Sequence, residues 1–171
     1  MFYALSFIYG AAIGSFVQVV ATRLHVAPIV KSKSKCLSCG EALRASDLIP
    51  VLSYLFLRGK CRYCKVPFGV EALFIEVGFG GLFVLLSHFF LIGTVPVVAL
   101  GWLVYYTLMF ITLGVIALYD YKHSYVPVAY LLSFTFLSFV MLGMRYVTEP
   151  TPAVLLGPLV VAFPFLFIWL V

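Results

Sequence analysis

The chain has 171 residues, of which 64% are hydrophobic and only 10% are charged, and its formal net charge is +5. An average soluble domain has roughly 25% charged residues. The composition therefore excludes an ordinary soluble protein and indicates an integral membrane protein. A spanning helix needs about 20 apolar residues, so the chain has room for several such helices and for no large domain outside the membrane.

Five apolar runs follow one another along the chain, at residues 2–21, 70–93, 95–119, 126–147 and 153–171. Each is long enough to cross a membrane, because about 20 helical residues span roughly 30 Å. The first run lacks the basic start and the clear cleavage site of a signal peptide, so we expect it to be a retained helix. It contains Gly10, Gly14 and Ser15, a small-residue spacing that either brings a neighbouring helix close or is filler.

The basic residues are concentrated between the first two apolar runs. Nine of the eleven Lys and Arg residues lie there, namely Arg23, Lys31, Lys33, Lys35, Arg44, Arg58, Lys60, Arg62 and Lys65. The positive-inside rule places this segment in the cytoplasm, with the N-terminus on the opposite side of the membrane. Attraction to anionic membrane lipids accounts for the basic run, and we expect no nucleic-acid binding.

We therefore predict an all-α polytopic membrane protein with about five transmembrane helices and a small cytoplasmic loop module. Helix 1 occupies residues 1–22, the loop module residues 23–69, and helices 2 to 5 residues 70–171.

All four cysteines lie in the loop module, as two C-x-x-C pairs that are separated by 21 residues: Cys36, Cys39, Cys61 and Cys64. This spacing is typical of a four-thiolate structural zinc site. Disulfides are disfavoured in the reducing cytoplasm, and the loop is too short for a thioredoxin-like fold; an iron–sulfur or redox role stays open as an alternative. Because four cysteines close the coordination shell, the metal holds the loop together and catalytic groups must lie elsewhere.

Six acidic residues are available for chemistry: Glu41, Asp47, Glu71, Glu76, Asp120 and Glu149. We expect solvation or backbone capping for Glu41 and Asp47, and a helix N-terminal position for Glu71. Glu76 should lie inside the second apolar run, where an ionisable group is either functional or a hydrogen-bonded structural residue. Asp120 ends the third run, at the membrane boundary on the side of the cysteines, and is either an interfacial residue or a catalytic one.

Several segments together resemble the bacterial type IV prepilin peptidases, also called prepilin leader peptidase/N-methyltransferases. They are GAAIGSFVQVVATRL, CLSC and CRYC with SDLIPVLSYLFLRGKC between them, PFGVEALFIEVGFGGLF and LYDYKHSYVP, in the order of the family. The resemblance implies a multi-pass aspartic peptidase of the bacterial inner (cytoplasmic) membrane that removes the leader of type IV prepilins or pseudopilins. It also implies a possible transfer of a methyl group from S-adenosylmethionine to the new N-terminus. Asp120 matches the first catalytic aspartate of the family, and Glu76 is a candidate supporting carboxylate.

The chain departs from the family pattern in its second catalytic motif. The family has a second aspartate in a downstream GxGD motif, whereas no acidic residue follows Glu149 here. We therefore expect a C-terminally truncated member that is inactive as given. The alternative is a non-enzymatic membrane zinc protein that binds a cytoplasmic partner through its basic loop.

Overall fold

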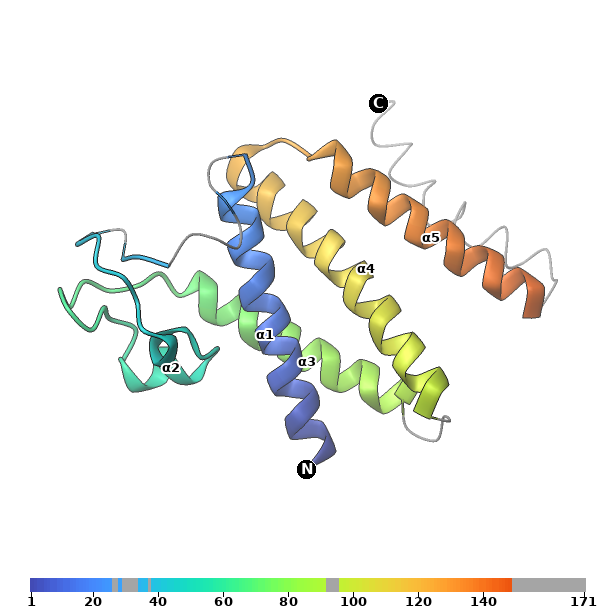
Figure 1. Cartoon of the computed structure of the whole chain (residues 1–171), viewed down its shortest axis with the longest axis horizontal. Helices are drawn as coiled ribbons and strands as arrows, with labels where there is room; N and C mark the ends of the chain where they lie inside the picture. The colour runs from blue at the N-terminus through green and yellow to red at the C-terminus, as the bar shows by residue number, and fades with distance from the viewer. Residues whose placement is uncertain (26–27, 29–33, 37, 92–95, 149–171) are drawn as a thin grey trace, which may run out of the picture. The chain divides into compact units, whose positions relative to one another are not determined.

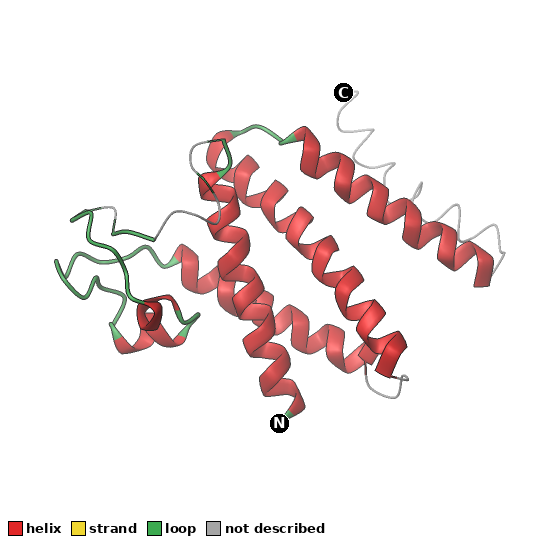
Figure 2. Ribbon diagram, in the orientation of Figure 1, coloured by secondary structure: helices red, strands yellow, loops and turns green. Residues whose placement is uncertain are grey.

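The computed structural model describes residues 1–25, 28, 34–36, 38–91 and 96–148. In this part of the chain the secondary structure is helical, with connecting loops and no strand (Figure 2). The chain forms two compact units, Met1–Pro127 and Val128–Val171.

The helices follow one another as α1 (Phe2–Arg23), the 3-10 helix η1 (Ala45–Leu48), α2 (Leu52–Phe56), α3 (Glu71–Leu86), the π-helical turn η2 (Ser87–Leu91), α4 (Pro96–His123) and α5 (Val128–Thr148). Among the described residues, four helical segments are long and apolar enough to cross a membrane, at Phe2–Arg23, Glu71–Phe89, Val97–His123 and Val128–Val147. They correspond to the first four runs that the sequence predicts. The fifth expected run, residues 153–171, lies outside the described residues.

Helix α1 packs closely against α3 through glycines (Figure 1). A Cβ atom added at Gly10 would lie 2.5 Å from the backbone oxygen of Phe79, and one at Gly14 would lie 3.0 Å from that of Ile75. The absence of a side chain at both positions lets the two backbones approach each other. Gly10 and Gly14 are therefore interface residues and not filler.

Helix α4 packs on the same helix α1, and the two run in the same direction. Tyr9 and Thr107 share a hydrogen bond of 3.0 Å between their hydroxyl groups. Just beyond the end of α1, the ring of His25 lies 6.4 Å from the ring of Tyr119 in α4. Because α1 is antiparallel to α3, the C-terminal ends of α1 and α4 and the N-terminal end of α3 lie at one end of the bundle, and the cysteine loop is attached there.

Helix α4 extends one turn beyond the boundary that the apolar run predicts, so that Asp120, Lys122 and His123 are helical. The ring of His123 packs on Tyr119, one turn earlier, with 4.4 Å between ring centroids. Basic side chains in a last helical turn also interact favourably with the helix dipole. The helix ends where Ser124 adopts a φ of 48° and its N–H bonds the carbonyl oxygen of Asp120 at 2.7 Å, the arrangement of a left-handed C-cap.

Candidate functional site

The two cysteine pairs meet in one cluster, as the sequence predicts. The sulfur atoms of Cys36, Cys39, Cys61 and Cys64 all lie within 4.8 Å of one another. The Sγ atoms of Cys36 and Cys64 are 3.8 Å apart, and four sulfurs at about 2.3 Å from a tetrahedral zinc ion would be separated by about 3.8 Å. The arrangement therefore provides the ligand set of a four-coordinate metal ion.

Each cysteine pair lies in the same backbone turn, repeated 25 places along the chain. The N–H groups of Cys36 and Cys61 donate to the carbonyl oxygens of Glu41 and Val66, both at 2.9 Å. The bridges Lys35↔Ala42 and Lys60↔Pro67 close the two turns in the same way. Two copies of one turn thus present two sulfurs each to a shared centre.

Backbone N–H groups prepare Cys36 to act as a thiolate ligand. Hydrogen bonds from the backbone of Cys39 and then Ser38 lower the pKa of the Cys36 thiol from 9.0 to about 6. A metal ligand must be deprotonated, so this turn favours the form of the side chain that binds metal.

An ion pair inside the loop module was not apparent from the sequence. Asp47 in η1 is buried, and its Oδ1 atom accepts a hydrogen bond of 2.9 Å from Nε of Arg62, which lies between Cys61 and Cys64. The Arg62 side chain lowers the pKa of Asp47. The expected capping role is confirmed as well, because Oδ2 of Asp47 accepts a hydrogen bond of 3.3 Å from the N–H of Arg44. The pair ties η1 to the second cysteine turn.

Glu76 is buried in α3, and its Oε2 atom accepts a hydrogen bond of 2.7 Å from the N–H of Val51. Val51 precedes α2 and has a φ of 61°, a conformation that bulky residues seldom adopt. The hydrogen-bonded structural role that the sequence left open for Glu76 is thus present. Its contact joins the loop module to a membrane helix.

Asp120 lies in the last turn of α4 and is exposed. Its neighbour Lys122 lines a cavity of about 1080 Å³ between the loop module, α1 and the start of α3, and this cavity is also lined by Cys36, Glu71 and Glu76. Asp120 itself is absent from the lining. The structure therefore brings Asp120 to the same end of the bundle as the cysteine cluster and Glu76.

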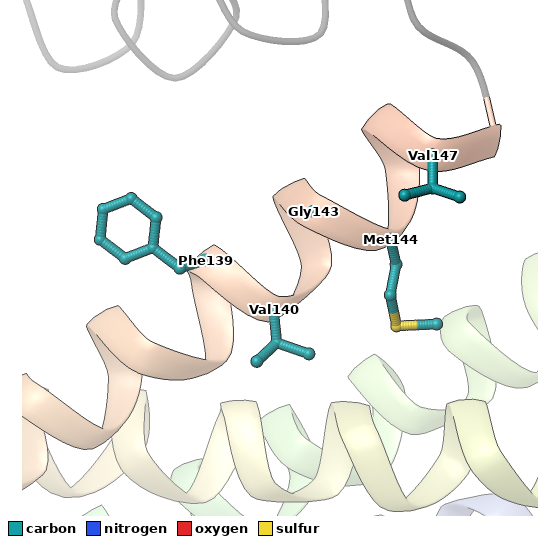
Figure 3. A pocket seen from close by; sticks show the side chains of 5 residues that line it. All are labelled: Phe139, Val140, Gly143, Met144 and Val147. Atoms are coloured by element: carbon teal, nitrogen blue, oxygen red, sulfur yellow. The ribbon is translucent and has the colours of Figure 1, made fainter.

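Another hollow lies on one face of α5 and is lined by Phe139, Val140, Gly143, Met144 and Val147 (Figure 3). None of these side chains can transfer a proton or bind a metal ion strongly. The four cysteines and the acidic side chains of the described residues lie instead at the cysteine end of the first unit.

Comparison with known proteins identifies the module. Residues 8–90 match the family model of the bacterial peptidase A24 N-terminal domain. This match contains the four cysteines and Glu76, and it ends before Asp120.

Curated relatives support the same family. The chain is 34% identical over 105 aligned residues to the prepilin leader peptidase/N-methyltransferase of Burkholderia pseudomallei, covering 46% of this chain and 34% of the relative. It is 39% identical over 84 residues to that of Myxococcus xanthus, covering 48% and 25%, and 34% identical over 115 residues to that of Klebsiella pneumoniae, covering 61% and 48%. The chain thus spans between a quarter and a half of the length of these relatives.

No solved structure shows significant similarity to it. Residues 8–90 therefore match the bacterial peptidase A24 N-terminal domain, and the chain is related in sequence to the prepilin leader peptidase/N-methyltransferases.

Proposed function

We propose that this chain supplies the metal-binding module and one catalytic carboxylate of a membrane-embedded aspartic peptidase that removes the leader of type IV prepilins or pseudopilins. The single observation that carries the proposal is the match of residues 8–90 to the peptidase domain, whose cysteine ligands cluster in the structure. The position of Asp120 at the same end of the bundle is consistent with a catalytic role.

Asp120 acts, in this proposal, as one of two carboxylates. One carboxylate takes a proton from the attacking water while the other, protonated, donates to the leaving amine. Two nearby carboxyl groups share a proton because both cannot readily be ionised together. Exposure of Asp120 suits this task, since a polypeptide substrate must reach it.

The partner carboxylate is the GxGD aspartate that the family resemblance implies. The 171 residues contain no such motif. General acid and general base effects each contribute typically 10² to 10⁴ in rate, so we expect no efficient cleavage by these residues alone.

The experiment joins the chain to a C-terminal segment of a curated relative that carries GxGD, and measures leader removal from a pilin precursor in membranes. We expect cleavage by the fusion, loss of cleavage in its Asp120→Asn form, and retained cleavage in Glu41→Gln, a matched amide replacement at an exposed acid. Efficient cleavage by the Asp120→Asn fusion would contradict the proposed role of Asp120. Efficient cleavage by residues 1–171 alone would contradict the need for the GxGD aspartate.

Zinc is the metal that we assign to the four cysteines, with a structural role. A closed set of four thiolates leaves no position for water, so the ion contributes folding free energy and no chemistry. Metal analysis should give about one zinc per chain, and less in Cys36→Ser, Cys39→Ser, Cys61→Ser and Cys64→Ser. Full zinc content in all four variants would exclude the site.

We also propose transfer of a methyl group from S-adenosylmethionine to the new N-terminus, on the strength of the relatives' names. The cavity of about 1080 Å³ at the cysteine end is large enough for a small-molecule cofactor. Transfer of a labelled methyl group to processed pilin by the active fusion tests this activity separately from cleavage.

The proposed location is the bacterial inner membrane, with the cysteine loop and Asp120 on the cytoplasmic side. The concentration of basic residues in the loop supports this orientation. In a background without the native cysteines, cysteines introduced at Ser46 and Ser124 should both resist a membrane-impermeant thiol reagent in intact cells. Strong labelling of either position would contradict the proposed cytoplasmic location of that position.

A further inference from the structure

The short helix α2 turns polar side chains toward the cavity and large apolar side chains outward, whereas a helix in a water-soluble protein usually does the opposite. Ser53, Tyr54 and Leu57 line the internal cavity. The opposite side carries Leu52, Leu55 and Phe56, which are 50%, 61% and 84% exposed. In a water-soluble module the larger apolar side chains would face inward, so the outer face of α2 suits an apolar surrounding.

The depth of α2 along the membrane helices identifies that surrounding. Ser15 lines the same cavity as Ser53 and Tyr54, and it lies eight residues before Arg23, about 12 Å from the end of α1 at 1.5 Å per residue. Val51, directly before α2, bonds Glu76, which is about 7.5 Å inside α3 from its first residue Glu71.

Helix α2 thus lies to the side of α1 and of the first turns of α3 (Figure 1), and not beyond the end of α1. Basic side chains such as Arg23 mark the ends of membrane spans. A segment that lies on the membrane side of this boundary, with its apolar face turned outward, meets the acyl chains of the leaflet.

Charges next to α2 fit the same leaflet. Arg58 and Lys60 lie two and four residues after the end of α2, and both are exposed. Interfacial helices commonly combine an apolar face with flanking Lys and Arg side chains that reach anionic head groups.

We propose that α2 is an interfacial membrane anchor, in which Leu52, Leu55 and Phe56 insert into the acyl-chain region of the anionic leaflet beside α1 and α3. The anchor holds the cysteine module against the bilayer. This inference concerns the lipid contacts of the module and holds whether or not the chain takes part in peptide cleavage.

Tryptophan fluorescence in vesicles tests the anchor. The native Trp102 and Trp169 are replaced by Phe, and Phe56→Trp is introduced as the only tryptophan. The purified protein, with its zinc content checked, is reconstituted into phosphatidylethanolamine/phosphatidylglycerol vesicles that contain acyl-brominated phosphatidylcholine. Glu41→Trp, at an exposed polar position of the first cysteine turn, is the matched control.

We expect brominated lipid to quench the Phe56→Trp protein strongly, and more from bromine near the head group than from bromine near the chain end, since interfacial helices insert only about 5–10 Å. Aqueous iodide should quench the Glu41→Trp control and barely affect the Phe56→Trp protein. If Phe56→Trp lowers zinc content, Leu55→Trp replaces it, because it presents the same face.

Strong iodide quenching of both α2 tryptophans with no effect of brominated lipid would overturn the anchor. Protection from iodide that appears only when a pilin precursor is added would show a protein-docking face, and would overturn it as well.

Discussion

Oε2 of Glu76 in α3 and the backbone N–H of Val51 at the start of α2 are 2.7 Å apart. This bond joins residues 25 positions apart, and its donor is the backbone of Val51, which has a positive φ of 61°. Glu76 therefore fixes how the loop module sits on the membrane helices.

We predict that Glu76→Leu destabilises the chain while Glu76→Gln is tolerated. Leucine leaves the N–H of Val51 without its acceptor, which costs about 1–3 kcal/mol for a buried group, whereas the glutamine carbonyl can still accept. Thermal unfolding in detergent, together with zinc retention, measures the difference. Equal stability of Glu76→Leu and the unmodified chain would exclude this role.

In the active fusion, the Glu76→Gln variant distinguishes a positioning role of Glu76 from a catalytic role. A positioning residue predicts that Glu76→Gln keeps most of the cleavage activity. Loss of cleavage in a stable Glu76→Gln protein would instead make Glu76 a catalytic carboxylate.

The ion pair between Asp47 and Arg62 predicts an unequal effect of its two removals. Arg62→Met leaves the buried Asp47 carboxylate without its strongest donor, while Asp47→Asn leaves a half-exposed guanidinium that water can solvate. We therefore expect Arg62→Met to lower the midpoint of thermal unfolding more than Asp47→Asn. The reverse order would show that the carboxylate is solvated in the folded protein.

The sequence predicts those features of the structure that depend on residues close together in the chain. The spans follow from the length of apolar runs, and the metal cluster follows from the C-x-x-C spacing. The partners of Glu76 and Asp47 lie 25 and 15 residues away, so the sequence identifies the acids without showing what they bind. The apolar run stops at Tyr119 because hydropathy falls at Asp120, whereas α4 continues to His123, whose ring packs on Tyr119.

The pKa of Cys36 predicts a pH dependence for the metal-free loop module. Since its folded value of about 6 lies below the ordinary 9.0, deprotonation stabilises the folded module fully above pH 9. This contribution is lost as the pH falls through the folded pKa of about 6.

Protease protection of residues 35–65 in the chelator-treated protein should therefore rise with pH over this range. The Cys36→Ser variant lacks the thiol and should show a flatter profile. Identical profiles for the two proteins would contradict the lowered pKa.

The repeated cysteine turn suggests a stabilising substitution. Gly40 and Lys65 both directly follow the second cysteine of a pair, with φ values of 73° and 61°. This conformation costs a non-glycine residue about 1–2 kcal/mol, which the greater freedom of glycine in the unfolded chain partly offsets. We expect Lys65→Gly to stabilise the module by about 0.5–1 kcal/mol and Gly40→Ala to destabilise it similarly, measured by thermal unfolding of the zinc-loaded protein.

A steric clash does not contribute at Gly40, because an added Cβ meets no heavy atom within 4 Å. Any loss in Gly40→Ala therefore reports backbone conformation and not a clash. A destabilising Lys65→Gly would show that the lysine side chain contributes more than its backbone strain costs.

The approach of α1 to α3 predicts that Gly10→Ala is destabilising and Gly81→Ala is not. The new Cβ at position 10 would lie 2.5 Å from the backbone oxygen of Phe79, which cannot move without its helix, whereas the space at Gly81 is open within 4 Å. Overpacking of this kind costs about 1–3 kcal/mol, while replacing glycine by alanine within an open helix surface gains roughly 0.5–1 kcal/mol. Thermal unfolding in one detergent should thus move the two variants in opposite directions from the unmodified chain. If Gly10→Ala is as stable as Gly81→Ala, the two helices are not in the close contact described here.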